Sequence, residues 1–136
     1  MTGFMPLLEK KKTHVMTILQ LTEKQARLIS DMETEALLEN IALRQKQLDR
    51  ITELEVQLKE LETQLGGYPE ETRDIYYEIL SLLEQISKKD KENEALAVAK
   101  REELKADMRK VAAAKRGNEA YERQSEGASV YFDKKE

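Results

Sequence analysis

Apolar residues recur at steps of three and four along three stretches of this chain, which is the spacing of one face of an α-helix. The first row consists of Val15, Ile18, Leu19, Thr22, Ala26, Ile29 and Met32. The second row consists of Leu37, Ile41, Leu48, Ile51, Leu54, Leu58, Leu61 and Leu65. The third row consists of Ile75, Ile79, Leu82, Leu83 and Ile86, followed after a gap by Leu96, Leu104, Met108 and Val111. The pattern predicts three helices and no strands.

Turn-forming residues separate the three rows. Gly66-Gly67-Tyr68-Pro69 is the strongest break, because glycine and proline both interrupt helices. A weaker break lies at residues 30–34, and another at Gly117. We therefore predict helices over about residues 6–30, 34–65 and 70–116, with Pro6 tolerated in the first turn. These helices form one bundle over residues 1–116, and residues 117–136 form a mobile C-terminal tail.

An amphipathic helix is stable in a protein mainly because its apolar face packs against another element. The predicted fold class is all-α: an elongated up-down-up bundle of three helices, or an antiparallel helical hairpin with coiled-coil character, with a flexible C-terminal tail. The two successive steps of three from Leu48 through Ile51 to Leu54 predict a local stammer. Residues 87–94 are all polar, so we expect this part of the third helix to project past its partners into solvent. The thin core favours a homodimer or an apolar row left open for a partner.

Composition narrows the class of protein. The 136 residues include no cysteine and one histidine, His14, which leaves no thiolate metal site, no Cys nucleophile and no two-His relay. The many acidic residues are typical of solvated helix surfaces paired with Lys and Arg. No apolar run approaches the length of a membrane span, and the N-terminus lacks the order of a secretory signal. We expect a cytoplasmic protein with no enzymatic activity, no catalytic residues, no metal, no cofactor and no membrane insertion.

The charge distribution bears on nucleic-acid binding. The net charge of -4 argues against a dedicated nucleic-acid binder, although residues 100–116 carry seven basic and three acidic side chains. This segment holds no aromatic residue for base stacking, and acidic residues interrupt it. We therefore favour a solvated helix face. A nucleic-acid-associated protein is kept as an alternative interpretation, and it predicts an affinity for nucleic acid that falls steeply with salt.

The last 20 residues are mostly polar, yet they contain three of the seven aromatic residues of the chain: Tyr121, Tyr131 and Phe132. Aromatic side chains on a mobile polar segment are typical of short binding motifs. The alternative is that the tail folds back on its own bundle. The sequence gives the two equal weight.

Several segments together suggest a family. The first helix ends in Glu23-Lys24-Gln25-Ala26-Arg27-Leu28-Ile29, and a hinge follows at Ser30-Asp31-Met32-Glu33. The second helix carries Arg44-Gln45-Lys46-Gln47, and the tail contains Ala120-Tyr121 and then Tyr131-Phe132-Asp133-Lys134-Lys135. In this layout the chain resembles the FlgN/FliT-like flagellar export chaperones, which are small acidic helical proteins.

The resemblance implies a function and its residues. Such chaperones bind late axial subunits of the bacterial flagellum (hook–filament junction or cap proteins) in the cytoplasm, prevent their premature assembly and deliver them to the membrane export gate. It also implies that partner contacts come from the C-terminal part of the helical hairpin and from the tail. On this chain the partner-binding candidates are Leu104, Met108, Val111, Tyr121, Tyr131 and Phe132.

The first interpretation is therefore a cytoplasmic chaperone of flagellar type III export. The alternative is a structural coiled-coil protein, an oligomerising spacer or adaptor whose apolar rows pair with its own copies. The break at residues 66–69 favours folding within one chain over a continuous rod.

Overall fold

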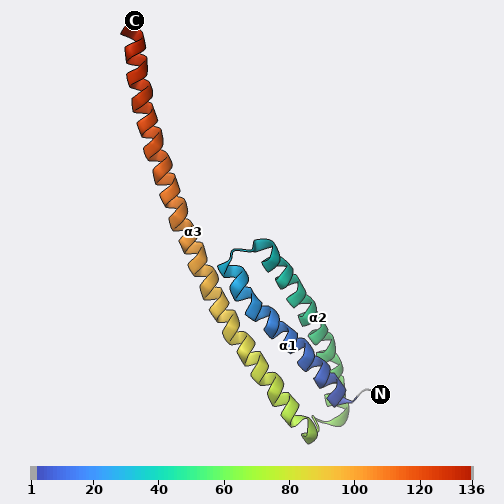
Figure 1. Ribbon diagram of the computed structural model, residues 1–136. Coiled ribbons are helices and arrows are strands. Elements are labelled where there is room, and N and C mark those ends of the chain that lie inside the picture. Colours follow the sequence, from blue (N-terminus) through green and yellow to red (C-terminus); the bar gives the residue numbers. More distant parts are fainter. Residues whose placement is uncertain (1–2, 136) are drawn as a thin grey trace. The chain divides into compact units, whose positions relative to one another are not determined.

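The computed structural model describes the backbone of residues 3–135 and the side chains of residues 3–122. It contains three α-helices, α1 (Phe4–Ser30), α2 (Thr34–Leu65) and α3 (Arg73–Lys135), and a short 3-10 helix, η1 (Glu70–Thr72) (Figure 1). No strand occurs among the described residues, so the predicted all-α class is confirmed. Within the same residues, no helix combines the length and the apolar content that crossing a membrane requires.

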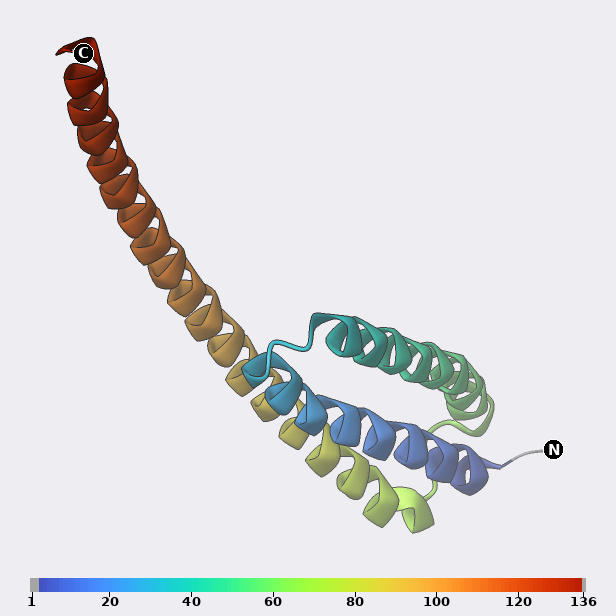
Figure 2. The ribbon, with the colours of Figure 1, turned by 45° about the horizontal axis from the view of Figure 1, so that its top comes forward.

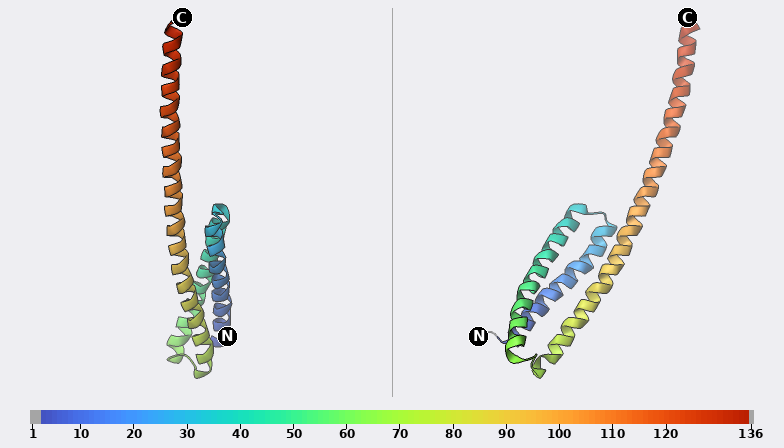
Figure 3. Two further views of the ribbon diagram at one scale, coloured as in Figure 1. Left: turned by 60° about the vertical axis from the view of Figure 1, so that its left-hand side comes forward. Right: turned by 180° about the vertical axis from the view of Figure 1, so that it is seen from behind.

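The chain divides into two units, Met1–Ala97 and Val98–Glu136, with α3 contributing to both. In the first unit α1, α2 and the first part of α3 lie side by side (Figures 2 and 3). The side chains of Lys11 and Glu55 form an ion pair between α1 and α2, which run antiparallel. Lys12 and Glu78 join α1 to α3, which run in the same direction. The up-down-up order is thus the one that the sequence predicts.

The turns explain the helix boundaries. Gly66 ends α2 in the left-handed region at φ 76°, a conformation that glycine adopts without steric cost, and the amide of Gly67 donates to the carbonyl of Glu62. Met32, between α1 and α2, also has a positive φ, 56°. At its start, α1 extends two residues before Pro6, which lies in the first turn. α3 starts at Arg73 because residues 70–72 form the 3-10 helix.

α3 does not end before Gly117, where the sequence predicts a break, but continues to Lys135. The residues around Gly117 account for this. Alanine, lysine, arginine and glutamate dominate residues 112–122, and these are strong helix formers. A single glycine costs a helix about 1 kcal/mol relative to alanine, which such neighbours can offset. The mobility of residues 117–136 stays a prediction.

The core of the first unit is one apolar cluster to which all three helices contribute. Its buried members are Phe4, Leu7, Leu8, Val15, Ile18, Ile51, Leu54, Leu58, Ile75, Ile79 and Ile86. Leu8 and Leu58 are among the most deeply buried side chains. The cluster occupies the half of the unit next to the 66–69 turn, so the bundle is stabilised mainly from that end.

The inward face of α2 differs from the row of leucines that the sequence suggests. It follows Asn40, Arg44, Gln47, Ile51, Leu54, Leu58 and Leu61 in alternating steps of four and three, so the predicted stammer is absent. Ile41, Leu48 and Leu65 are exposed. Polar residues take the inward positions in the first half of α2 because polar groups of α1 and α3 face them.

The polar stretch at residues 87–94 is helical and packed, and the expectation that it projects into solvent was wrong. Asn93 is buried, and its amide nitrogen donates to the backbone carbonyl of Thr22 on α1 over 2.8 Å. Asp90 binds Arg44 on α2. The stretch lacks apolar residues because its inward positions belong to a hydrogen-bonded network.

Candidate functional site

The second unit carries the predicted partner-binding residues whose side chains the structure describes. It is formed by the part of α3 that begins at Val98. Ion pairs between neighbouring turns support this helix, with distances of 3.4 Å from Lys100 to Glu103 and 3.6 Å from Lys105 to Glu102. Exposed pairs at this spacing each stabilise a helix by only about 0.2–0.5 kcal/mol. The helix is therefore held by its composition and by many small contributions.

Leu104, Met108 and Val111 form an apolar row on this helix. Steps of four and three place them within about 60° of one another around the axis, at about 100° per residue. Their exposed fractions are 39%, 70% and 67%, so Met108 and Val111 are mostly exposed and Leu104 is exposed over more than a third of its surface. Three neighbouring apolar side chains left in water on one helix face favour contact with a partner.

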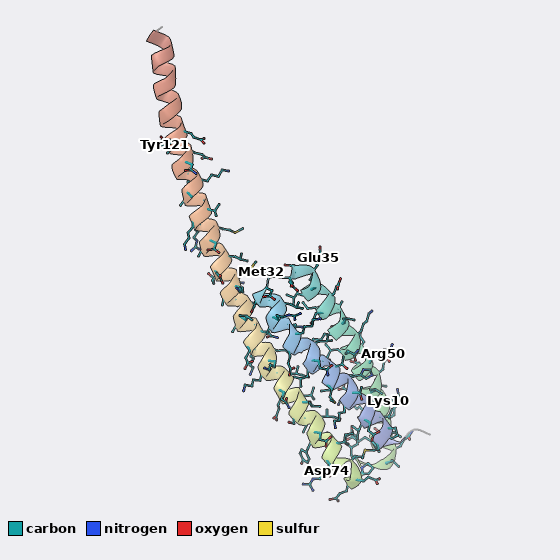
Figure 4. All side chains as sticks on the ribbon, viewed as in Figure 1. Lys10, Met32, Glu35, Arg50, Asp74 and Tyr121 are labelled. Carbon is teal, nitrogen blue, oxygen red and sulfur yellow. The ribbon has the colours of Figure 1, made fainter. Side chains whose placement is uncertain are left out.

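Tyr121, which is labelled in Figure 4, is also exposed, at 74%. It does not extend the row of Leu104, Met108 and Val111. Counting about 100° per residue places it roughly a quarter turn away from Leu104, on the side of Glu103. The structure thus groups three of the predicted residues and sets Tyr121 on a flank. The side chains of Tyr131 and Phe132 lie outside the described residues, so their predicted role stays a prediction.

Charged side chains border the apolar row differently on its two sides. Arg101, Lys105, Arg109 and Arg116 lie on one side, between about 50° and 130° from the centre of the row, and we call them the basic flank. Glu119 lies at the same angle as Arg101, and Glu102 lies at the outer edge of this side. The other side mixes acidic Glu103 and Asp107 with basic Lys100 and Lys110. The sequence count of seven basic and three acidic residues in this segment does not by itself show this separation.

A second feature is the buried polar network of the first unit. Its members come from all three helices and are Thr22, Gln25, Asn40, Arg44, Asp90 and Asn93. The amide of Gln25 donates to Asn40 over 2.9 Å, and Asn40 donates to the carbonyl of Leu21 over 3.0 Å. Among the described residues, no buried side-chain nitrogen or oxygen lacks a hydrogen-bond partner. A fully paired network fixes the register of the helices, since a shifted helix would leave buried polar groups unpaired.

Arg44 is the centre of this network. Its guanidinium donates to the hydroxyl of Thr22 and to the carboxylate of Asp90. The hydrogen bond with Asp90 raises the pKa of Arg44 above its ordinary value, although burial of the guanidinium acts in the opposite direction. The network therefore holds a permanent positive charge that is neutralised within the bundle.

An aromatic cluster lies at the other end of the first unit. The rings of Phe4 and Tyr68 meet edge to face at 4.9 Å, Tyr76 is 6.1 Å from Tyr68, and Tyr77 is 5.9 Å from Tyr76. An open pocket of about 1020 Å³ beside the three tyrosines is lined equally by basic and acidic residues. Sequence reasoning missed this cluster because Phe4 is far from the three tyrosines in the chain. Burial, and secondly the charge of Glu62, raise the pKa of Tyr68.

Candidate chemistry elsewhere is limited. His14 is partly buried between α1 and α2, and its Nδ1 lies 2.6 Å from Oε1 of Gln47. No three His, Cys, Asp or Glu side chains of the described residues are placed to share a metal ion. Near the C-terminal end of the side chains described, the chain instead offers an exposed apolar row beside a basic flank.

Comparisons with protein-family models, with curated proteins and with solved structures each return no match.

Proposed function

We propose that this protein is a non-enzymatic binding protein of the bacterial cytoplasm that serves flagellar type III export as a chaperone. It binds late axial subunits, the hook–filament junction or cap proteins, keeps them from assembling early and delivers them to the export gate. The observation that supports a binding role is the exposed apolar row Leu104, Met108 and Val111. The choice of cargo follows from the resemblance to the FlgN/FliT-like chaperones.

The physical case rests on incomplete burial. A lone amphipathic helix gains stability when its apolar face is covered, and a partner helix can cover it. An axial subunit that has not yet assembled exposes an amphipathic terminal helix, whose apolar face a partner helix can also bury. Pairing the two removes apolar surface of both proteins from water, which is favourable by about 25 cal/mol per Å².

The test is co-purification of the tagged chain with the flagellar junction and cap proteins, followed by light scattering of any complex. A stoichiometric complex that survives high salt supports the proposal and identifies the cargo. The variant Met108→Ala/Val111→Ala should lose most of this binding. Its matched control is Leu38→Ala/Val56→Ala, which removes two similarly exposed apolar side chains from α2, and it should keep the binding.

Thermal unfolding of the two variants separates binding from folding. Both should unfold at the temperature of the parent protein, because all four side chains are exposed. If Met108→Ala/Val111→Ala instead melts early without any partner, the row belongs to a packed interface and the binding proposal fails.

The second candidate is a structural coiled-coil protein or adaptor that pairs with its own copies as a homodimer. Exposed Ile41 and Leu48 on α2 favour it, because they offer further apolar surface for self-association. This candidate predicts a discrete oligomer of the purified chain alone, and Ile41→Ala/Leu48→Ala should dissociate that oligomer.

A further inference from the structure

We propose that the helix bound by the second unit carries a row of acidic side chains beside its apolar row, and that these acids pair with the basic flank. The inference rests on the proposed binding function and specifies the chemistry of the partner at the same surface. It concerns Arg101, Lys105 and Arg109, which lie next to Leu104 and Met108.

The spacing of the flank defines the spacing of the acids. Arg101, Lys105 and Arg109 follow one another at steps of four, so their attachment points rise by about 6 Å from one to the next. Two helices that pack as in a coiled coil cross at about 20°, which keeps their side chains in register over several turns. A partner helix with Glu or Asp every three or four residues on one side of its apolar row can therefore meet all three cations.

The basic flank has more positive charges than carboxylates that pair with them. Arg101 and Lys105 share one carboxylate, that of Glu102, at 3.7 Å and 3.6 Å. Arg109 makes no ion pair within the described residues, and its guanidinium can bind a carboxylate through two hydrogen bonds. Because the other side of the apolar row mixes both signs of charge, an acidic row on the partner fits only the basic flank.

The charges select the partner more than they hold it. Exposed ion pairs contribute little affinity individually, whereas like charges brought together at an interface are strongly unfavourable. The apolar row would provide the affinity, and the basic flank would set the orientation of the bound helix and reject helices with basic flanks.

The surface is less suited to polyanions. A nucleic acid would use the basic flank, where Glu102 already pairs with Arg101 and Lys105, and would leave the apolar row in water. An anionic membrane surface would use both, but residues 98–122 contain no Trp or Phe to anchor the helix in the headgroup region. An acidic amphipathic helix uses both parts of the surface at once.

The test uses two synthetic helical peptides that share a leucine row and differ in one flank, which carries either glutamates or lysines at steps of four. Binding to the full chain is measured by fluorescence anisotropy at low and at high salt. The glutamate peptide should bind at least about tenfold more tightly than the lysine peptide at low salt, and the difference should shrink with salt.

Two variants with the same change in net charge locate the effect. Arg109→Glu should lower the affinity for the glutamate peptide by about tenfold and raise the affinity for the lysine peptide, because it reverses the charge at one contact. Lys110→Glu alters the neighbouring residue on the opposite flank and should change either affinity less than about twofold. Both residues are exposed, so folding of the bundle should not change.

Equal binding of both peptides, with Arg109→Glu behaving like Lys110→Glu, would overturn the inference and leave the proposed function standing. If the parent chain binds neither the cargo nor either peptide, the result would instead contradict the proposed function. A third outcome is that duplex DNA or vesicles rich in phosphatidylserine bind tightly, that Arg109→Glu abolishes this binding, and that neither peptide binds. This outcome would also overturn the inference and assign the basic flank to a polyanion.

Discussion

Arg44 of α2 and Asp90 of α3 form a two-point ion pair, in which each carboxylate oxygen accepts one hydrogen bond from the guanidinium, at 2.5 and 2.7 Å. The same guanidinium donates to the hydroxyl of Thr22 on α1. One side chain thus links all three helices of the first unit. The link lies in the half of the unit where the inward residues are polar, away from the cluster around Leu8 and Leu58.

Replacing Arg44 by methionine should lower the free energy of unfolding by about 1.5–2 kcal/mol. Hydrogen bonds to charged groups contribute about 1.5–3 kcal/mol. The lower part of that range applies because the Asp90 side chain is 40% exposed and keeps some of its hydration after the substitution. Urea unfolding followed by circular dichroism measures the change.

The control for Arg44→Met is Glu78→Gln, which breaks the ion pair between Lys12 and Glu78 on the surface of the same bundle. Both of these side chains are well exposed, so the loss should stay below about 0.5 kcal/mol. Equal losses in the two variants would mean that the network around Arg44 adds nothing beyond a surface pair.

The overall fold follows from local signals that the sequence contains. Gly66 and Pro69 mark the turn between α2 and η1, where Gly66 adopts a left-handed conformation and α2 stops, as the sequence predicts. The rows of Ile75, Ile79 and Ile86 and of Ile51, Leu54 and Leu58 identify the core, because burial of large apolar side chains dominates packing.

What the sequence did not reveal depends on pairing between distant residues. Asn40 and Asn93 look like surface residues until a partner for each is known, so the sequence favours the row that contains Ile41 and Leu48 as the inward face. The aromatic cluster is not predictable for the same reason, since Phe4 and Tyr68 meet only after the bundle folds. The separation of charges beside Leu104 is visible only when residues are placed around a helix.

Replacing Leu58 by alanine should destabilise the protein by about 2–5 kcal/mol, the range for a large-to-small change in a packed core. Leu58 is almost completely buried in the cluster of all three helices, so the change leaves a cavity. Val56→Ala, two residues away and 57% exposed, should change stability by less than about 0.5 kcal/mol. Similar effects of the two substitutions in urea unfolding would contradict the assigned inward face of α2.

Replacing Gly66 by alanine should destabilise the protein by about 1–2 kcal/mol, because a side chain at positive φ clashes with the following carbonyl. The space around Gly66 is open, so the effect comes from the backbone and not from packing. Urea unfolding measures it. An unchanged midpoint would mean that the turn can adopt a conformation with negative φ.

Gly117→Ala should act in the opposite direction and increase the helix content. Alanine is more favourable than glycine inside a helix by about 0.5–1 kcal/mol. Nothing lies within 4 Å of the position where the new Cβ would stand. Far-ultraviolet circular dichroism and amide hydrogen exchange of residues 112–122 are the measurements. A fall in ellipticity would instead show that the helix ends at Gly117, as the sequence alone suggests.

The stability of the bundle should fall as the pH rises above about 10, the ordinary pKa of tyrosine, because of Tyr68. Burial of its ring, and secondly the nearby charge of Glu62, raise the pKa of Tyr68, so the folded chain holds the phenol proton more tightly than the unfolded chain. The contribution is therefore complete below the unfolded-state pKa and is lost as the pH rises through the folded-state pKa. Tyr68→Phe removes this proton and should make the fall in unfolding free energy shallower, as measured by urea unfolding at several pH values.

Glu62→Gln tests the cause of the same effect. Removing the carboxylate leaves the burial of Tyr68 in place, so the fall above about pH 10 should become shallower than in the parent protein but remain steeper than in Tyr68→Phe. Ultraviolet titration of the tyrosines in the folded protein should show the same order. If the fall is equally steep in all three proteins, other groups of the bundle control its stability at high pH and Tyr68 does not.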